Sequence, residues 1–213
     1  MTTRTILVTN IKGGCGKTTV ATNLAAAYAN GGMVTALADI DRQKSSLDWL
    51  ARRPKDVPPV ETLDWRKTIG KPKKKTQRLI VDSPAAMRNK IVRELLKEAD
   101  ALVVPLQPSV LDEGSTGRFL KIIGDEKAVL KGRLPVYFVL NRVKPRTNAL
   151  NRAADFLESI GYPSVINVND RTIYDDLIAN GTGIFDHGGK RMLPLIEQWQ
   201  PLLTALEADF AKN

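Results

Sequence analysis

Residues 10–19 read NIKGGCGKTT, with a short apolar run before them and an alanine-rich helical pattern after them. Glycines let successive backbone N–H groups curl around phosphate oxygens, and a helix N-terminus adds a favourable dipole. In such a loop Lys17 neutralises phosphate charge and Thr18 can ligate Mg²⁺. A glycine-rich turn with an unrelated lysine is the alternative, but strand, Gly-Lys-Thr and helix occur in the order that phosphate binding requires. The sequence predicts a phosphate-binding loop formed by Lys12, Gly13, Gly14, Cys15, Gly16, Lys17, Thr18 and Thr19.

Around this loop, strand-like and helix-like segments alternate along the chain. The apolar runs are 5–9, 34–38, 79–81, 101–105 and 136–140, and the helical patterns are 18–30, 45–53, 88–99, 113–124, 149–160 and 173–179. This alternation predicts a doubly wound α/β fold with a mostly parallel sheet and helices on both faces. At 213 residues one domain spanning 1–213 is expected. The proline-rich stretch 54–75 is expected to be an irregular surface excursion within that domain.

Three aspartates follow two of the predicted strands. Asp39 and Asp41 end the second strand, and Asp82 ends the third. In open α/β sheets, ligands bind at the carboxyl ends of the strands, so these side chains are candidates for a site beside the phosphate loop. Asp82 is a candidate for holding Mg²⁺ through water. For Asp39 and Asp41 the alternative is a role in forming the turn.

The order Lys-Gly-Gly-x-Gly-Lys-Thr-Thr resembles the deviant Walker A loop of the ParA/MinD family of ATPases, and the resemblance extends across most of the chain. It implies binding of ATP and Mg²⁺, with Lys12 reaching across a nucleotide-sandwich dimer to the partner's phosphates. A solvated lysine is the alternative for Lys12. The resemblance further implies that Asp41 positions the attacking water and that Asp39 helps to organise the magnesium environment. Arg42 stands where the family has proline.

The same resemblance extends to Asn141 and Arg142, which end the predicted strand 136–140 where these proteins contact adenine. The single cysteine, Cys15, excludes an iron–sulfur cluster, which needs several thiolates. Cys15 is expected to fill space in the loop, with a redox-sensitive loop as the alternative. The only histidine, His187, is assigned no role.

The chain end helps to choose among branches of the family. An apolar stripe is expected to pack on the domain itself; it comprises Leu193, Ile196, Trp199, Leu203, Leu206 and Phe210. Residues 194–213 hold three acids and one lysine, which disfavours anionic membranes, and no apolar run is long enough for a membrane span. Because no long segment precedes the loop, we expect no operator-specific DNA-binding extension. The chain looks closer to small ParA-type ATPases than to MinD.

Charge suggests a polyanionic partner. The net charge is +9 and the pI about 9.7, and two stretches, 66–78 and 142–152, contain basic residues without an acid. Nonspecific DNA is the expected partner, because lysine and arginine contact phosphates independently of base sequence. The candidate contacts are Lys73, Lys74, Lys75, Arg146 and Arg171. A solvated loop is the alternative for the first cluster, and charge near the nucleotide for the second.

Together these features predict a cytoplasmic, nucleoid-associated ATPase. Its ATP-bound homodimer is expected to bind DNA nonspecifically and to hydrolyse ATP weakly until a ParB-like or cargo-adaptor protein stimulates it, with no membrane involved. Plasmid, chromosome and subcellular cargo all remain open. Two other classes also remain: a MinD-like regulator acting through a protein partner, and an ATP-dependent ligase of a small metabolite.

Overall fold

The structure is a computed structural model that describes residues 2–85, 87, 89–124, 129, 132–162 and 164–212. The strands are β1 (Arg4–Val8), β2 (Thr35–Asp39), β3 (Val60–Asp64), β4 (Arg78–Asp82), β5 (Ala101–Leu106), β6 (Val136–Val143) and β7 (Ser164–Asn169). The helices are α1 (Lys17–Asn30), α2 (Ser45–Arg52), α3 (Asn89–Glu98), α4 (Val110–Gly124), α6 (Asn148–Ser159), α7 (Ile173–Ala179) and α8 (Leu193–Phe210), with a 3₁₀ turn, η1 (Ile184–Asp186). Arg88, which begins a predicted helix, lies outside the described residues.

The described strands form one parallel sheet in the order β3-β2-β4-β1-β5-β6-β7. The chain therefore winds outward from β1 in both directions, and the predicted doubly wound α/β fold is confirmed. The registers place Val8 beside Asp82, and Asp82 beside Asp39. This arrangement brings the ends of β1, β4 and β2 together at one edge of the sheet, which we call the carboxyl edge.

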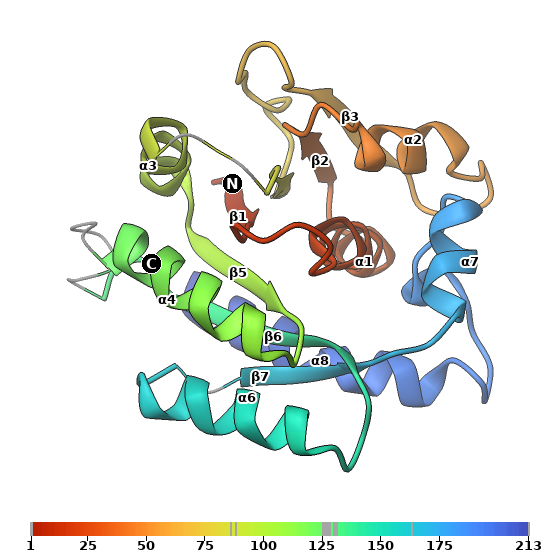
Figure 1. The fold of residues 1–213 in the computed structure, drawn as a ribbon. Coiled ribbons are helices and arrows are strands. Elements are labelled where there is room, and N and C mark those ends of the chain that lie inside the picture. The colour runs from red at the N-terminus through yellow and green to blue at the C-terminus, as the bar shows by residue number, and fades with distance from the viewer. Residues whose placement is uncertain are drawn as a thin grey trace.

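Alternation along each buried strand divides the core into two layers. Ile6 and Val8 of β1 pack in one layer with residues of α1, α2, α7 and α8. Leu7, between them, packs in the other layer with residues of α3, α4 and α6. Figure 1 shows α4 and α6 in front of β5–β7 and α8 behind them. Helices on both faces explain why these strands read as continuous apolar runs.

Two strands were missed in the sequence analysis. The stretch 54–75 was expected to be irregular throughout, but it contains β3, and β7 was also not predicted. Both lie at the outer edges of the sheet. An edge strand is only partly covered, so it carries a weaker apolar signal, and β3 has no fully buried residue. The rest of the stretch, 54–59 and 65–75, is irregular as expected. We call residues 65–77 the crossing segment, because they lead from the carboxyl edge of β3 to the start of β4.

Helix α8 packs on its own domain, as predicted, through a stripe that shares Trp199, Leu206 and Phe210 with the expected one. Its buried residues are Leu195, Trp199, Leu202, Leu206 and Phe210, whereas Leu193 is 51% exposed. The expected stripe was therefore wrong in phase over the first turn. Trp199 is fully buried, and its indole N–H donates to the Tyr174 hydroxyl at 3.1 Å. No described helix is both long and apolar enough to span a membrane.

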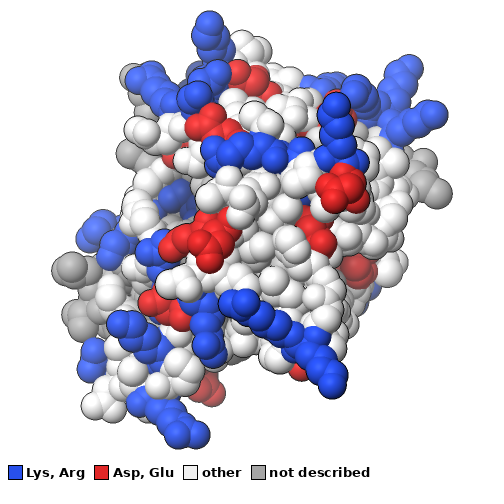
Figure 2. Space-filling view, turned by 90° about the vertical axis from the view of Figure 1, so that its right-hand side faces the viewer, with Lys and Arg blue, Asp and Glu red and all other residues white. Residues whose placement is uncertain are grey.

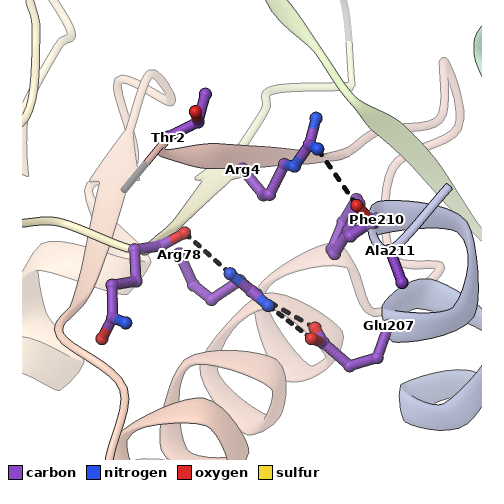
Figure 3. A pocket seen from close by; sticks show the side chains of 7 residues that line it. Thr2, Arg4, Arg78, Glu207, Phe210 and Ala211 are labelled. Atoms are coloured by element: carbon purple, nitrogen blue, oxygen red, sulfur yellow. Dashed lines mark hydrogen bonds and ion pairs between the residues drawn. The ribbon is translucent and has the colours of Figure 1, made fainter. Parts of the chain in front are cut away.

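The last turns of α8 are fastened to the starts of β1 and β4 around a hollow of about 350 Å³ (Figure 3). Arg78 forms a two-pronged ion pair with Glu207, and Arg4 donates to the Phe210 carbonyl at 3.0 Å. Arg4 also pairs with Asp100. The charges of both guanidinium groups that face this hollow are thus neutralised by carboxylates. Arg78, although it belongs to the basic stretch 66–78, therefore holds α8 against the sheet.

Candidate nucleotide-binding site

The glycine-rich loop joins β1 to α1, as the motif requires. Gly14 and Gly16 have φ values of 77° and 91°, which residues with a Cβ adopt at a cost. The Lys17 side chain is buried and curls back over the loop, so that its ammonium donates to the Lys12 carbonyl at 2.9 Å. The loop is therefore folded into a cradle, with Lys17 held inside it.

A second strand end fixes the position of this loop. Asn141, near the end of β6, is buried and donates from Nδ2 to the Cys15 carbonyl at 2.9 Å. A methyl group on Gly16 would lie 1.9 Å from that same nitrogen, so the contact requires glycine. Cys15 is itself buried, and its thiol donates to the Lys12 carbonyl at 3.3 Å. The expected space-filling residue thus also contributes a hydrogen bond within the loop.

Asp82 stands at the centre of the polar site. Its Oδ2 accepts hydrogen bonds from the hydroxyl groups of Thr18, at 2.8 Å, and Ser46, at 2.7 Å. Burial raises the pKa of the Asp82 carboxyl to about 7, the bonds from Ser46 and Thr18 lower it, the charge of Asp39 raises it and that of Lys17 lowers it. The protein therefore holds a carboxyl whose charge is only partly compensated by its own groups.

Several buried oxygens in this region have no described hydrogen-bond partner. They are Thr9 Oγ1, Asp82 Oδ1 and Ser83 Oγ, which follow or end the neighbouring strands β1 and β4. Unsatisfied buried polar atoms are costly and call for a ligand, ion or water. Carboxylate and hydroxyl oxygens are ligands that Mg²⁺ prefers, so Thr18 and Asp82 fit the predicted magnesium site.

Asp39 contributes to this site indirectly, through hydrogen bonds to the backbone around it. Its Oδ1 accepts from the backbone N–H of Asp41, and its Oδ2 accepts from the N–H groups of Ser46 and Leu47. Burial raises the pKa of Asp39 against the lowering effect of these three bonds. Asp39 thus caps α2 and holds Ser46 against Asp82, which agrees with an indirect, organising role.

Asp41 lies further out, at the start of the turn into α2. It is half-buried, and its Oδ1 accepts from the Gln43 N–H at 3.0 Å. This is the geometry of an Asx turn, the alternative weighed for this residue, although a turn does not exclude contact with a ligand. The neighbouring Arg42 is exposed.

Hydrogen bonds join the first residues of the phosphate loop to β5 and to the residue that follows it. Asn10 donates to the Pro105 carbonyl at 2.7 Å and accepts from the Lys12 N–H at 3.2 Å. Gln107, just after β5, donates to the Gly14 carbonyl at 2.9 Å. Lys12 is half-buried, and hydrogen bonds on both sides of it therefore hold its backbone in place.

Beside the loop, a narrow hollow occupies the carboxyl ends of β6 and β7. It is lined by Thr19, Asn141, Arg142, Asn169, Asp170, Arg171, Tyr174 and Asp175. Arg142 is exposed with a φ of 53°. Both residues expected at adenine, Asn141 and Arg142, line this hollow, but the Asn141 amide is already engaged by the phosphate loop.

Residues 6–182 match the family model described as the CobQ/CobB/MinD/ParA nucleotide binding domain. The chain belongs to this family. Among its curated relatives, the maintenance of carboxysome distribution protein A of Halothiobacillus neapolitanus is 28% identical over 193 residues, covering 87% of this chain and 88% of that protein. The protein of the same name from Gloeobacter kilaueensis is 32% identical over 152 residues, covering 68% and 65%.

Solved structures agree in fold with this member of the ParA/MinD family. A plasmid partition protein of Borrelia burgdorferi bound to AMPPNP superposes with a TM-score of 0.75 at 15% identity, covering 96% of this chain and 100% of that one. An ATP complex of a McdA variant from Cyanothece gives 0.68 at 15% identity, covering 98% and 96%.

The two basic clusters of this ParA/MinD-family chain lie at opposite ends of the parallel strands. Arg146 and Arg171, both exposed, follow β6 and β7 at the carboxyl edge, near the phosphate loop. The exposed lysines 73–75 precede β4 at the other edge, because the strands are parallel. The candidate DNA contacts therefore do not form one continuous patch on a single subunit.

Carboxylates also neutralise part of the first cluster. Arg66 pairs with Asp64 at 2.6 Å, and Lys73 lies 3.6 Å from Glu61. Figure 2 shows the side that carries α2 and α7, where basic side chains project along the upper and lower borders and acidic ones lie between them. On this side basic and acidic side chains are interspersed, and the basic ones do not gather into a single patch.

Sequence reasoning missed Ser46 as a site residue. Serine is not diagnostic of a site by itself. The available signal was position, because Ser46 lies in the first turn of the helix that follows the Asp39 strand.

Proposed function

We propose that the protein is a ParA-type positioning ATPase that binds ATP and Mg²⁺ and works as an ATP-dependent homodimer. The observation that carries this proposal is the cluster of Thr18, Ser46 and Asp82 beside the Lys17 cradle, with buried oxygens still unsatisfied. Such a cluster is suited to a metal–phosphate group, since hard cations prefer oxygen ligands.

On one subunit, the loop binds the phosphates. Lys17 leaves the Lys12 carbonyl to contact phosphate oxygens, and the backbone N–H groups of residues 13–19 surround them. Thr18 and Asp82 hold Mg²⁺, which neutralises phosphate charge when bound. Asn141 keeps the loop in register through the Cys15 carbonyl, and Arg142 flanks the base.

Two residues act beyond the cradle. Lys12 faces the phosphates of the partner subunit, where a second ammonium offsets repulsion between two nucleotides. Asp41 positions the attacking water from the half-buried turn before α2. Among the described residues, the Asp41 carboxylate accepts one hydrogen bond, from the Gln43 N–H, so the carboxylate is able to reorient. Hydrolysis is slow until a ParB-like or cargo-adaptor protein binds.

DNA binding follows the nucleotide state. Arg146 and Arg171 are exposed at the same edge as the phosphate loop, so a dimer formed through that edge brings both pairs together. Their contacts are to phosphates, and they weaken steeply with salt. Lys73, Lys74 and Lys75, at the opposite edge, contribute to DNA affinity only as a separate surface. The protein then resides on the nucleoid in the cytoplasm.

Relatives named for carboxysome distribution and a protein named ParA favour a cargo-positioning role over a metabolite ligase. We infer that the cargo is a large cellular body or a plasmid, linked through the activating partner. The protein releases DNA when that partner stimulates hydrolysis.

Retention on nonspecific duplex DNA tests the switch. With ATP, the wild-type protein is retained several-fold more strongly than with ADP or without nucleotide. Lys12→Ala abolishes this difference, while Lys55→Ala, which removes an exposed lysine outside the site, preserves it. Equal retention in all three states would refute the switch.

Turnover tests the role of Asp41. Asp41→Ala retains ATP-dependent dimerisation, measured by sedimentation, but loses hydrolysis. Asp56→Ala, an exposed acid after α2, keeps both. Full turnover in Asp41→Ala removes this residue from the hydrolytic step and leaves nucleotide binding intact.

A further inference from the structure

A groove of about 650 Å³ lies on the face of the sheet that α3 covers, between α3 and the crossing segment. We call it the α3 groove. Its floor is apolar and buried, formed by Leu7, Leu79 and Val81 of the sheet and Leu95 of α3. Ordinary ligand sites occupy roughly 300–1,000 Å³, so this volume is large enough for several side chains of a partner.

One wall of the α3 groove is basic. Lys71, Lys73 and Lys74 of the crossing segment line it, and Lys97 of α3 faces them together with Glu94 and Glu98. Only Lys73 has a described ion-pair partner, Glu61. Among the described residues, no carboxylate lies within ion-pair distance of Lys71 or Lys74. Lys71 and Lys74 therefore carry uncompensated positive charge at the rim of the groove, above an apolar floor.

Two larger side chains of the crossing segment complete the groove. Ile69 is 42% exposed, and Trp65 is 8% exposed. No described residue accepts a hydrogen bond from the Trp65 indole N–H, and a methyl group on Gly70 would lie 3.3 Å from this nitrogen. The groove therefore offers an apolar lip and an indole donor beside the lysines.

We propose that the α3 groove binds a short segment of a partner protein, in which apolar anchor side chains are flanked by aspartate or glutamate. The anchors occupy the apolar floor, and the acids meet the lysines of the crossing segment. Nonspecific DNA uses only the charges, because its contacts are to phosphates, and an apolar floor adds nothing to them. This assignment goes beyond the proposed function.

The position of the groove leaves the nucleotide site free. Its lining includes Thr3 and Thr5, at the start of β1, whereas the phosphate loop follows the other end of that strand. A partner seated here therefore contacts the protein without covering the edge that binds nucleotide, and binding is measurable without ATP.

The probe is a pool of fluorescein-labelled ten-residue peptides, in which two leucines stand three or four positions apart and are flanked by Glu and Asp. In one counterpart pool serine replaces leucine, and in the other lysine replaces the acids. By fluorescence anisotropy without nucleotide or DNA, we expect the acidic, leucine-containing pool to bind at least about tenfold more tightly than either counterpart, since both the apolar and the charged contacts are needed.

Variants locate the binding. Ile69→Asp removes the apolar lip, and Lys71→Glu/Lys74→Glu reverses the rim; each is expected to weaken binding by about tenfold or more. Lys55→Glu/Lys190→Glu makes the same change in net charge at exposed lysines outside the groove and leaves binding unchanged. Trp49 and Trp199 are fully buried in the other core layer, so a change in tryptophan emission on binding disappears in Trp65→Phe, while anisotropy still reports binding.

Three results would overturn the assignment. One is equal binding of the three pools. Another is that the Lys55→Glu/Lys190→Glu control loses as much peptide affinity as Lys71→Glu/Lys74→Glu. The third is that Lys71→Glu/Lys74→Glu lowers retention on nonspecific DNA while peptide binding stays unchanged, because the lysines then serve DNA. None of these measurements depends on ATP hydrolysis, so failure here is distinguishable from failure of the proposed ATPase.

Discussion

The Ser46 hydroxyl donates a 2.7 Å hydrogen bond to Asp82 Oδ2, the same oxygen that accepts from Thr18. One carboxylate oxygen therefore joins the first turns of α1 and α2 at the end of β4. The backbone of Ser46 is fixed in turn by Asp39. In the proposed function Thr18 turns to Mg²⁺, and Ser46 on α2 is then the described partner that this oxygen keeps.

Replacing this hydroxyl isolates its contribution. We expect Ser46→Ala to lower the free energy of unfolding by about 1–3 kcal/mol, because it leaves a buried carboxyl with one donor fewer. The pKa of Asp82 rises further, since the Ser46 bond lowers it. Urea denaturation at pH 8 measures the change. Ser45→Ala, at an exposed neighbour, stays within about 0.5 kcal/mol of wild type, and an equal loss in both variants contradicts the assignment.

The pKa of Asp82 makes a signed prediction. Burial raises it to about 7, against about 4 in an unfolded chain. A carboxyl whose pKa is higher in the folded state destabilises the fold as pH rises from 4 through 7. Asp82→Asn, measured without nucleotide and with a chelator, is therefore more stable than wild type at pH 8, by up to about 4 kcal/mol. The difference vanishes below pH 4, and a gain independent of pH contradicts the mechanism.

The sequence was sufficient where the signal was local. The glycine-rich loop between strand and helix can be recognised from a few adjacent residues, and so can the aspartates at strand ends. The parallel α/β order then brings Lys17 and Asp82 to the carboxyl edge. The paired registers also explain why Asp39, predicted to act indirectly, lies beside Asp82. Each of these inferences needed only the chain order and the side-chain chemistry.

Long-range packing was not accessible in this way. The edge strand β3 carries partly exposed residues, and its pairing with β2 depends on the whole sheet. Asn141 was placed near adenine by resemblance, but its contact with the Cys15 carbonyl joins positions 126 residues apart. The stripe of α8 was out of phase at Leu193, since the start of a helix depends on what it packs against.

The link between Asn141 and Cys15 supplies a test of loop positioning. Asn141→Ala leaves the Cys15 carbonyl unpaired and opens space next to Gly16. We expect nucleotide affinity to fall about tenfold and the free energy of unfolding to fall by about 1–2 kcal/mol. Titration with a fluorescent ATP analogue and urea denaturation measure these changes. Asn151→Ala, on the exposed face of α6, changes neither, and wild-type affinity in Asn141→Ala excludes a positioning role.

A buried ion pair fastens the end of α2 to the last residue of η1. Arg53 donates to both oxygens of Asp186 at 2.8 Å, and Asn30 and the Gly183 N–H donate to the same carboxylate. Burial raises the pKa of Asp186, but these bonds and the Arg53 charge lower it overall. Stability contributed by Asp186 is therefore present above about pH 4, the ordinary aspartate pKa, and is lost as pH falls through its lower folded pKa.

Removing either partner of this pair leaves a buried charge uncompensated. Arg53→Met and Asp186→Leu each lower the free energy of unfolding by about 3–5 kcal/mol. The double variant loses less than the sum of the two single losses, because no unpaired charge remains, and its stability no longer falls with Asp186 protonation in acid. Thermal and urea unfolding between pH 3 and pH 8 measure the stability of the wild type, the two single variants and the double variant. Arg52→Met, at an exposed neighbour, is the control. Additive losses in the double variant mean that the two side chains act separately, and the end of α2 is then held chiefly by Trp49, whose indole donates to the Thr182 carbonyl.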